Sequence, residues 1–432
     1  MRRLLIILAV FALMVAACDP GDDTEGAETT AAGTTSPTPD AWPTCFKPAA
    51  FYSEDEACAN LDPEESEVRG QEAEAVEIIG GVFLDTRPNG DPLDHFCEIQ
   101  EDHVFVVLAQ DFNPADFSLE PVSAEQLSFT GELADEEAES AEAALGLYAE
   151  LQLGLFLITD GAEVLTRVDE IQESGFEASP HYVLAPTPTW KYGPHTTVET
   201  LTGWHWSQLP TTGEDASGSR VVVIDTGALG DPGAEIGVGE AEPEGNVPNS
   251  VQGHGVFAAS IVKQFNHSLS VDLYRAGFMD GTLTEASVTA ALVRAGPVEA
   301  DVVNLSLGTY ICAEEYGSLG LTAVLSNLDD TVHIVAASGN DAESDPNHPT
   351  MYPAILGVGS GTLAGQITAV GALDVTGNRA VWSNAAEVEA PGENLVGWYH
   401  DGNTGGLAVW SGTSFAAPHF AACLASGLCE MP

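Results

Sequence analysis

The sequence predicts an α/β fold built on a parallel sheet and preceded by a small α+β domain. After Trp204, apolar runs that end in small or polar residues alternate with alanine-rich segments of helical period. The apolar runs are RVVVIDTG (220–227), SVDLYRAG (270–277), ADVVNLSLG (300–308), VHIVAASGN (332–340) and QITAVGALD (366–374). Helical period recurs in LTEASVTAALVRAG (283–296) and GSLGLTAVLSNL (317–328). Such alternation indicates a parallel sheet whose functional site lies beyond the carboxyl ends of its strands.

The preceding region, residues 41–185, mixes strand-like and helix-like segments in a different order. Strands are expected at HVFVVLA (103–109), GLFLIT (154–159) and HYVLA (181–185), and helices at residues 135–153 and 162–173. Pro186, Pro188 and Pro194 then interrupt regular structure. We therefore expect an α+β domain over 41–185, a linker over 186–204, and the parallel-sheet domain over 205–432.

The chain of 432 residues is strongly acidic, with 66 Asp and Glu against 12 Lys and Arg and a formal net charge of −54. A field of this sign repels nucleic acid and anionic lipid surfaces, so a nucleic-acid partner is disfavoured. The acidic excess is typical of a solvated, aggregation-resistant surface.

The first residues, MRRLLIILAVFALMVAAC, join two arginines to an apolar run of signal-peptide length. The run ends in VAAC, which resembles the lipobox of bacterial lipoproteins, so residues 1–18 are expected to form a signal peptide and Cys18 to carry the lipid that anchors the protein to the membrane. The alternative is an ordinary signal peptide cut near the same place. Residues 19–40, rich in Thr, Gly, Pro and acid, have the composition of a flexible tether.

Six cysteines remain after Cys18, an even number in an exported chain. They are Cys45, Cys58, Cys97, Cys312, Cys423 and Cys429. The pairs Cys423–Cys429 and Cys45–Cys58 are close enough for local disulfides, but spacing leaves the connectivity open. Zinc is the weaker interpretation, because the sequence has neither paired CxxC motifs nor HExxH.

Three segments carry a resemblance to the subtilisin-like serine proteases: VVVIDTG with Asp225, GHGVFAASIV with His254, and SGTSFAAPH with Ser414. They occur in that family's order of Asp, His and Ser. The resemblance implies a subtilisin-like sheet with helices on both faces, and a serine endopeptidase that hydrolyses peptide bonds through an acyl-enzyme. Asp225 would orient the imidazole, His254 would act as base and then acid, and Ser414 would attack.

The surroundings of Ser414 suit a nucleophile at a helix start, where the backbone N–H and the helix N-terminus favour a developing oxyanion. Gly412 and two alanines allow close approach, and Pro418 is expected near the first helical turn.

Further blocks extend the resemblance. IVAASGN offers Asn340 as a side-chain donor in the oxyanion hole, and NLSLG matches the edge strand that holds substrate in extended form. YPA at Tyr352 and EAPGENL at Glu389 follow in family order. The residues expected to bind substrate are Ser306, Leu307, Gly308, Ala337, Ser338 and Gly339. No cofactor is expected; calcium is common in the family, yet the acidic loop at residues 231–246 is better explained as solvated.

Departures from the family pattern leave alternatives open. Val256 and Phe257 replace a Thr and a second, non-catalytic His, Thr309 stands where a glycine is common, and the chain stops at Pro432 soon after the serine block. A catalytically weak or inactive member of the fold that acts as a binding module is therefore the second hypothesis. The third is a non-enzymatic envelope lipoprotein whose N-terminal domain carries the function.

The segment at residues 162–190 resembles the end of a subtilisin-family propeptide: a helix, a turn, a last extended strand and a linker. Such a domain covers the substrate groove and is cut off by the enzyme itself. The alternative is a permanent accessory domain that spaces the protease from the membrane.

Overall fold

A computed structural model of the chain describes residues 81–85, 96–127, 135–186, 195–196, 216, 218–228, 236–238, 253–277, 283–296, 300–312, 316–343, 347–400 and 405–429. The expected signal peptide, the lipidation site Cys18, the tether and the Cys45–Cys58 pair lie outside the described residues, as does most of the acidic loop at 231–246.

The second half of the chain forms a seven-stranded parallel sheet of order β15-β14-β13-β11-β7-β9-β8. Its strands are β7 (Arg220–Asp225), β8 (Gly237–Val238), β9 (Ser270–Arg275), β11 (Val302–Leu305), β13 (His333–Ala337), β14 (Ile367–Leu373) and β15 (Val388–Pro391). The helices are α4 (His254–Phe265), α5 (Glu285–Ala295), α6 (Gly320–Leu325), α7 (Thr413–Ala425) and the 3-10 turn η8 (Ala354–Leu356). The predicted α/β class is confirmed.

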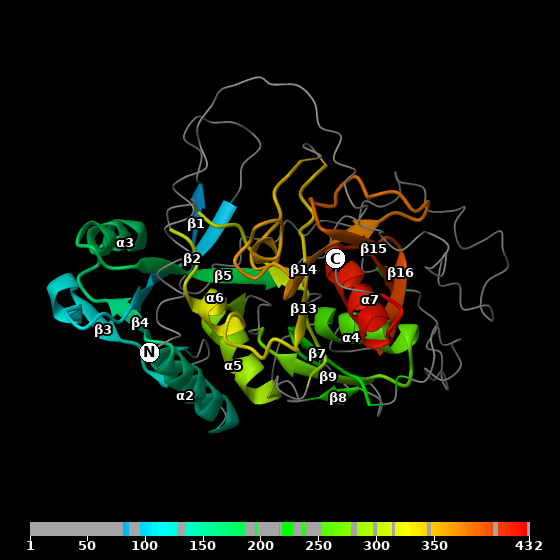
Figure 1. The fold of residues 1–432 in the computed structure, drawn as a ribbon, viewed down its shortest axis with the longest axis horizontal. Helices are drawn as coiled ribbons and strands as arrows, with labels where there is room; N and C mark the ends of the chain where they lie inside the picture. Colours follow the sequence, from blue (N-terminus) through cyan, green and yellow to red (C-terminus); the bar gives the residue numbers. More distant parts are fainter. Residues whose placement is uncertain are drawn as a thin grey trace, which may run out of the picture.

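Helices cover both faces of this sheet, which is why its central strands are apolar at successive positions. In β7, Val222 and Ile224 join a cluster with α5 and α6, whereas Val221 and Val223 join a cluster with α4 and α7. Figure 1 shows α5 and α6 on one side of the sheet and α4 and α7 on the other.

The small domain is an antiparallel sheet of order β5-β2-β4-β3, with β1 beside β2. Its elements are β1 (Gly81–Asp85), β2 (Phe96–Val107), η3 (Pro114–Phe117), β3 (Leu119–Pro121), η4 (Ala124–Leu127), α2 (Asp135–Glu150), β4 (Leu153–Ile158), α3 (Val164–Glu173) and β5 (Ala178–Pro186). The strands and helices expected in this region are therefore present, and β5 runs one residue into the expected linker.

The last strand of the small domain joins the two domains. After its pairing with β2, β5 pairs antiparallel with β10 (Leu283–Thr284) and then with β12 (Leu307–Gly308). A strand that begins in one hydrophobic core thus ends as a neighbour of the parallel-sheet domain (Figure 1).

The segment expected as a linker contains a short strand, β6 (His195–Thr196). It pairs with β17 (Gly405–Trp410), which pairs with β16 (Leu395–His400), in a separate three-stranded sheet. Pro194 stands directly before β6 and has no N–H to donate to a neighbouring strand.

Candidate active site

Asp225 and His254 lie side by side at the carboxyl edge of the parallel sheet. Asp225 is the last residue of β7 and His254 the first residue of α4, and both side chains are buried. Asp225 Oδ1 lies 2.7 Å from His254 Nδ1 and also accepts the N–H of Thr226 at 2.7 Å. Because an ionised carboxylate can only accept, the geometry requires the hydrogen on Nδ1 and leaves Nε2 as the basic nitrogen.

Ser414 is the second residue of α7 and is fully buried. Two hydrogen bonds tie it to Ser306: the Ser414 hydroxyl donates to the Ser306 carbonyl at 3.2 Å, and the Ser306 hydroxyl donates to the Ser414 carbonyl at 2.6 Å. The nucleophile candidate is therefore held against the chain that leads into β12.

The position of Pro418 explains the second of these bonds. We predicted it near the first turn, which is wrong: it is the sixth residue of α7. Proline has no N–H, so the carbonyl four residues earlier, that of Ser414, lacks its usual helical donor. The Ser306 hydroxyl takes that place, which is how the helix tolerates an internal proline here.

Aromatic rings surround the imidazole on its apolar side. The ring centroid of His254 lies 5.1 Å from that of Phe415, the neighbour of Ser414, and 5.7 Å from that of Trp410. Phe257, one of the residues that depart from the family pattern, packs at 4.6 Å from Phe415. Among the described residues, His254 Nε2 has no hydrogen-bond partner, so in this structure the imidazole and the Ser414 hydroxyl are neighbours that are not hydrogen-bonded.

Asn340 lies just beyond β13 and contacts the start of α7. The N–H of Thr413 donates to Asn340 Oδ1 at 2.9 Å, and the N–H of Gly339 donates to the Thr413 hydroxyl at 3.1 Å. The oxygen end of the Asn340 amide is thereby oriented, and the NH₂ group forms its other end.

The two segments expected to bind substrate are brought together. One is Ser306 with the two residues of β12, and the other runs from Ala337, the end of β13, to Gly339. Thr309 and Tyr352 exchange two backbone hydrogen bonds of 2.9 and 2.8 Å. The N–H of Met351 donates to the carbonyl of Ser338 at 2.9 Å, so the chain around Met351 bridges the two segments.

Sequence reasoning missed several residues that shape this site. The ring of Trp410 is one example. Ser306, Phe257 and Phe415 lie in segments that the sequence singles out, but the contacts of the Ser306 hydroxyl and of the two rings are not among the expectations. Beside the site, Asn384 Nδ2 donates to the Tyr310 hydroxyl, which in turn donates to Asp341 Oδ2 at 2.6 Å. No local pattern marks these contacts, because only the tertiary fold brings their segments together.

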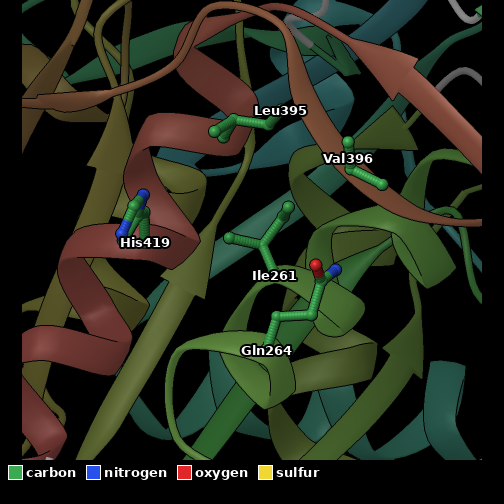
Figure 2. A pocket seen from close by; sticks show the side chains of 5 residues that line it. All are labelled: Ile261, Gln264, Leu395, Val396 and His419. Atoms are coloured by element: carbon green, nitrogen blue, oxygen red, sulfur yellow. The ribbon is translucent and has the colours of Figure 1, made fainter. Parts of the chain in front are cut away.

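A small hollow lies elsewhere, between α4, β16 and α7 (Figure 2). Its lining residues are Ile261, Gln264, Leu395, Val396 and His419. Burial lowers the pKa of His419 to about 4, so this histidine is neutral near pH 7. The hollow does not contain any of the candidate catalytic residues.

In the described part of the chain, no group of three or more His, Cys, Asp or Glu side chains is arranged to hold a metal ion. A disulfide joins Cys423 to Cys429, as one of the two expected local pairs. None of the described helices combines the length and the apolar character needed to cross a membrane.

Comparison with known proteins identifies the protein class to which the chain is similar. Residues 217–430 match the Subtilase family, Peptidase_S8. The chain is 32% identical over 227 residues to subtilisin BL of Lederbergia lenta, covering 49% of this chain and 77% of that protein. It is 31% identical over 227 residues to subtilisin Savinase of the same organism, with the same coverage. With thermitase of Thermoactinomyces vulgaris it shares 26% identity over 225 residues, 48% of this chain and 74% of the relative.

These matches and the parallel-sheet fold define a serine-type endopeptidase that acts on proteins or peptides. The chain belongs to the subtilase family.

Proposed function

We propose that the chain is an exported, membrane-anchored endopeptidase in which Asp225, His254 and Ser414 form the catalytic triad. The single observation that carries the triad is the buried 2.7 Å contact between Asp225 Oδ1 and His254 Nδ1 beside the start of α7. A buried, orienting carboxylate is what an imidazole base needs, because it fixes the tautomer and stabilises the imidazolium that forms.

Catalysis begins with rotation of the Ser414 hydroxyl from the Ser306 carbonyl toward His254 Nε2. Ser414 Oγ attacks the carbonyl carbon of the scissile bond while its proton passes to Nε2. The tetrahedral intermediate collapses as His254 returns that proton to the leaving amine, which gives an acyl-enzyme on Ser414. Water repeats the sequence and releases the acid, and Asp225 stays ionised throughout.

The negative charge of the intermediate is stabilised by the N-terminus of α7 and by the Asn340 side chain. The contact from the Thr413 N–H to Asn340 Oδ1 supports this role, because it orients the amide with its NH₂ group as the donor. Substrate would bind as an extra strand along β12, in the manner in which β5 lies against it.

A fluorophosphonate probe tests the triad. We expect it to label the purified protein, and labelling to disappear in Ser414→Ala and in His254→Ala. A matched control is Ser426→Ala, which changes a serine at the other end of α7 and should leave labelling intact. A correctly folded wild type that is never labelled would favour the binding-module alternative instead.

We further propose that Cys18 carries a lipid. The support is the sequence VAAC after a two-arginine, apolar leader. Cys18→Ser should move the protein from the membrane fraction to the medium. Membrane association that persists in the variant, with an unmodified mature N-terminus, would contradict the anchor.

The small domain is proposed to be a propeptide. The pairing of Ala185 with Gly308 and of Pro186 with Leu307 supports it, since the tail of this domain then lies along the proposed substrate strand. The wild type should yield a new N-terminus between about residues 185 and 204, while Ser414→Ala stays full length. The same intact species from both, with the wild type active, would favour a permanent accessory domain.

A further inference from the structure

The register of β5 on β12 locates the residue of a bound peptide that would face Ser414. Ala185 lies opposite Gly308 and Pro186 opposite Leu307. A peptide strand that keeps this register puts its next residue opposite Ser306, whose carbonyl accepts the Ser414 hydroxyl at 3.2 Å. That residue, here called P1, is therefore the one whose carbonyl carbon Ser414 would attack.

The face on which the P1 side chain lies follows from strand geometry. Directly opposed residues of an antiparallel pair point to the same face, and alternate residues along one strand share a face. The P1 side chain thus points to the same side as Ser306 and Gly308. The absence of a side chain at Gly308 would leave room there.

Met351 already occupies that room. A Cβ atom built on Gly308 would lie 2.9 Å from the Tyr352 carbonyl oxygen, 3.1 Å from Met351 Cβ and 3.5 Å from Met351 Cε. A Cβ built on Gly339, in the second substrate-binding segment, would meet Asn384 Nδ2 first and would lie 2.6 Å from Met351 Sδ and 2.7 Å from Met351 Cγ. The thioether side chain therefore spans the gap between the two glycines.

The backbone around Met351 is fixed from both sides. Its N–H donates to Ser338 at 2.9 Å, and the following residue, Tyr352, is buried and pairs with Thr309. Only the rotatable side chain is left to move, since moving the main chain breaks these contacts.

We propose that Met351 fills the P1 side-chain space and restricts this peptidase to small P1 residues, namely Gly, Ala and Ser. The inference rests on the proposed catalytic role of Ser414 and deepens it by naming a residue that determines specificity. A methylene more or less in an apolar pocket is worth about 10–200-fold in discrimination, so a side chain the size of methionine is enough to exclude Leu and Phe.

Tetrapeptide para-nitroanilides that differ only at P1 test the proposal on the full chain. The wild type is expected to prefer Ala over Leu and Phe by at least about 10-fold in kcat/KM. Met351→Ala and Met351→Gly should raise kcat/KM for Leu and Phe, relative to the value for Ala, by about 10-fold or more. Met351→Leu, which conserves volume, should keep the wild-type preference.

Two further measurements separate the outcomes. Val381→Ala, at a side chain that is 73% exposed, controls for effects of substitution as such, and thermal melting shows whether each variant is folded. Equal cleavage after Ala and Phe by the wild type, or an unchanged profile in folded Met351→Ala, would overturn the proposal, because the methionine would then swing aside for large residues. In either case labelling of Ser414 by the fluorophosphonate still reports the triad. No labelling would remove the proposed function and this inference with it.

Discussion

On one face of the parallel sheet, α7 packs with small and apolar side chains against β13 and β14. On the other face, α5 and α6 share an apolar cluster with the small domain, and buried hydrogen bonds cross the same contact. Ala416, Ala417 and Ala421 of α7 belong to the first cluster. At the second, the buried carboxylate of Glu285 accepts the Tyr182 N–H at 3.0 Å and the Leu321 N–H at 2.9 Å.

The two contacts differ in their buried polar groups. The α7 contact is apolar, whereas the small-domain contact adds hydrogen bonds, which can be regained from water on separation, to its apolar packing. Tyr148 adds to the second contact, since its hydroxyl lies 2.8 Å from Thr289 Oγ1 of α5. The contact with α5 thus combines an apolar core with specific hydrogen bonds, as interfaces between partners do.

The largest expected effect is a loss of kcat when triad residues at or beside the start of α7 are replaced. Ser414→Ala and His254→Ala should each lower kcat by about 10⁶, a magnitude that comes from subtilisin itself. The double variant should be hardly worse, because the residues act as one unit. Steady-state kinetics check this, and losses that multiply would contradict the assignment.

A smaller loss is expected at Asn340. Asn340→Leu removes the proposed oxyanion donor and should lower kcat by about 10²–10³ with little change in KM, again a magnitude known from subtilisin. Asn340→Asp is the matched variant, since it keeps an oxygen for the Thr413 N–H while it removes the donor. If Asn340→Asp retains wild-type kcat, Asn340 only positions α7.

The contact with α5 is tested by Glu285→Ala, which leaves the donors of Tyr182, Leu321 and Ser318 without their acceptor. Each buried donor left unpaired costs about 1–3 kcal/mol, so the free energy of unfolding should fall by about 3 kcal/mol or more. Urea unfolding measures it in the Ser414→Ala background, which is expected to stay full length. Glu150→Ala, at an exposed position on α2, is the control and should change little.

The smallest expected effect is a pH dependence of stability at the same contact, through His181. Burial, and to a lesser extent the nearby charge of His103, lower the pKa of His181 well below 6.5, and its Nε2 accepts the N–H of Ala286. A lowered folded-state pKa gives stability that is present above pH 6.5 and is lost as the pH falls toward the folded-state pKa.

The free energy of unfolding should therefore be lower at pH 5.5 than at pH 7. Protonation of His181 contributes about 1.4 kcal/mol to this difference for each pH unit below 6.5. His103 also faces His181, and Glu285 directly precedes Ala286, the donor to His181. Burial raises the pKa of Glu285, so its own contribution runs the other way, with stability lost as the pH rises through its folded-state pKa. His181→Gln should reduce the loss on acidification; an equal loss in this variant assigns it to other groups.

The sequence predicted elements better than contacts. Runs such as VVVI of β7 are apolar throughout because both faces are buried, and they were recognised for that reason. The pairings of β5 with β12 and of β6 with β17 join segments over 100 residues apart. The local sequence of each segment does not specify its partner. The same holds for Met351, whose place between two glycines depends on the tertiary pairing of its neighbour Tyr352 with Thr309.

Ser306 makes two hydrogen bonds with Ser414: its carbonyl accepts the Ser414 hydroxyl, and its hydroxyl donates to the Ser414 carbonyl. Any shift of the substrate edge relative to α7 must break the second bond and leave the Ser414 carbonyl without a donor, because Pro418 offers none. The binding edge and the nucleophile therefore move as one body. For anyone who wishes to retarget this peptidase, the side chain at Met351 is open to change, whereas alteration of Ser306 would disturb catalysis and recognition together.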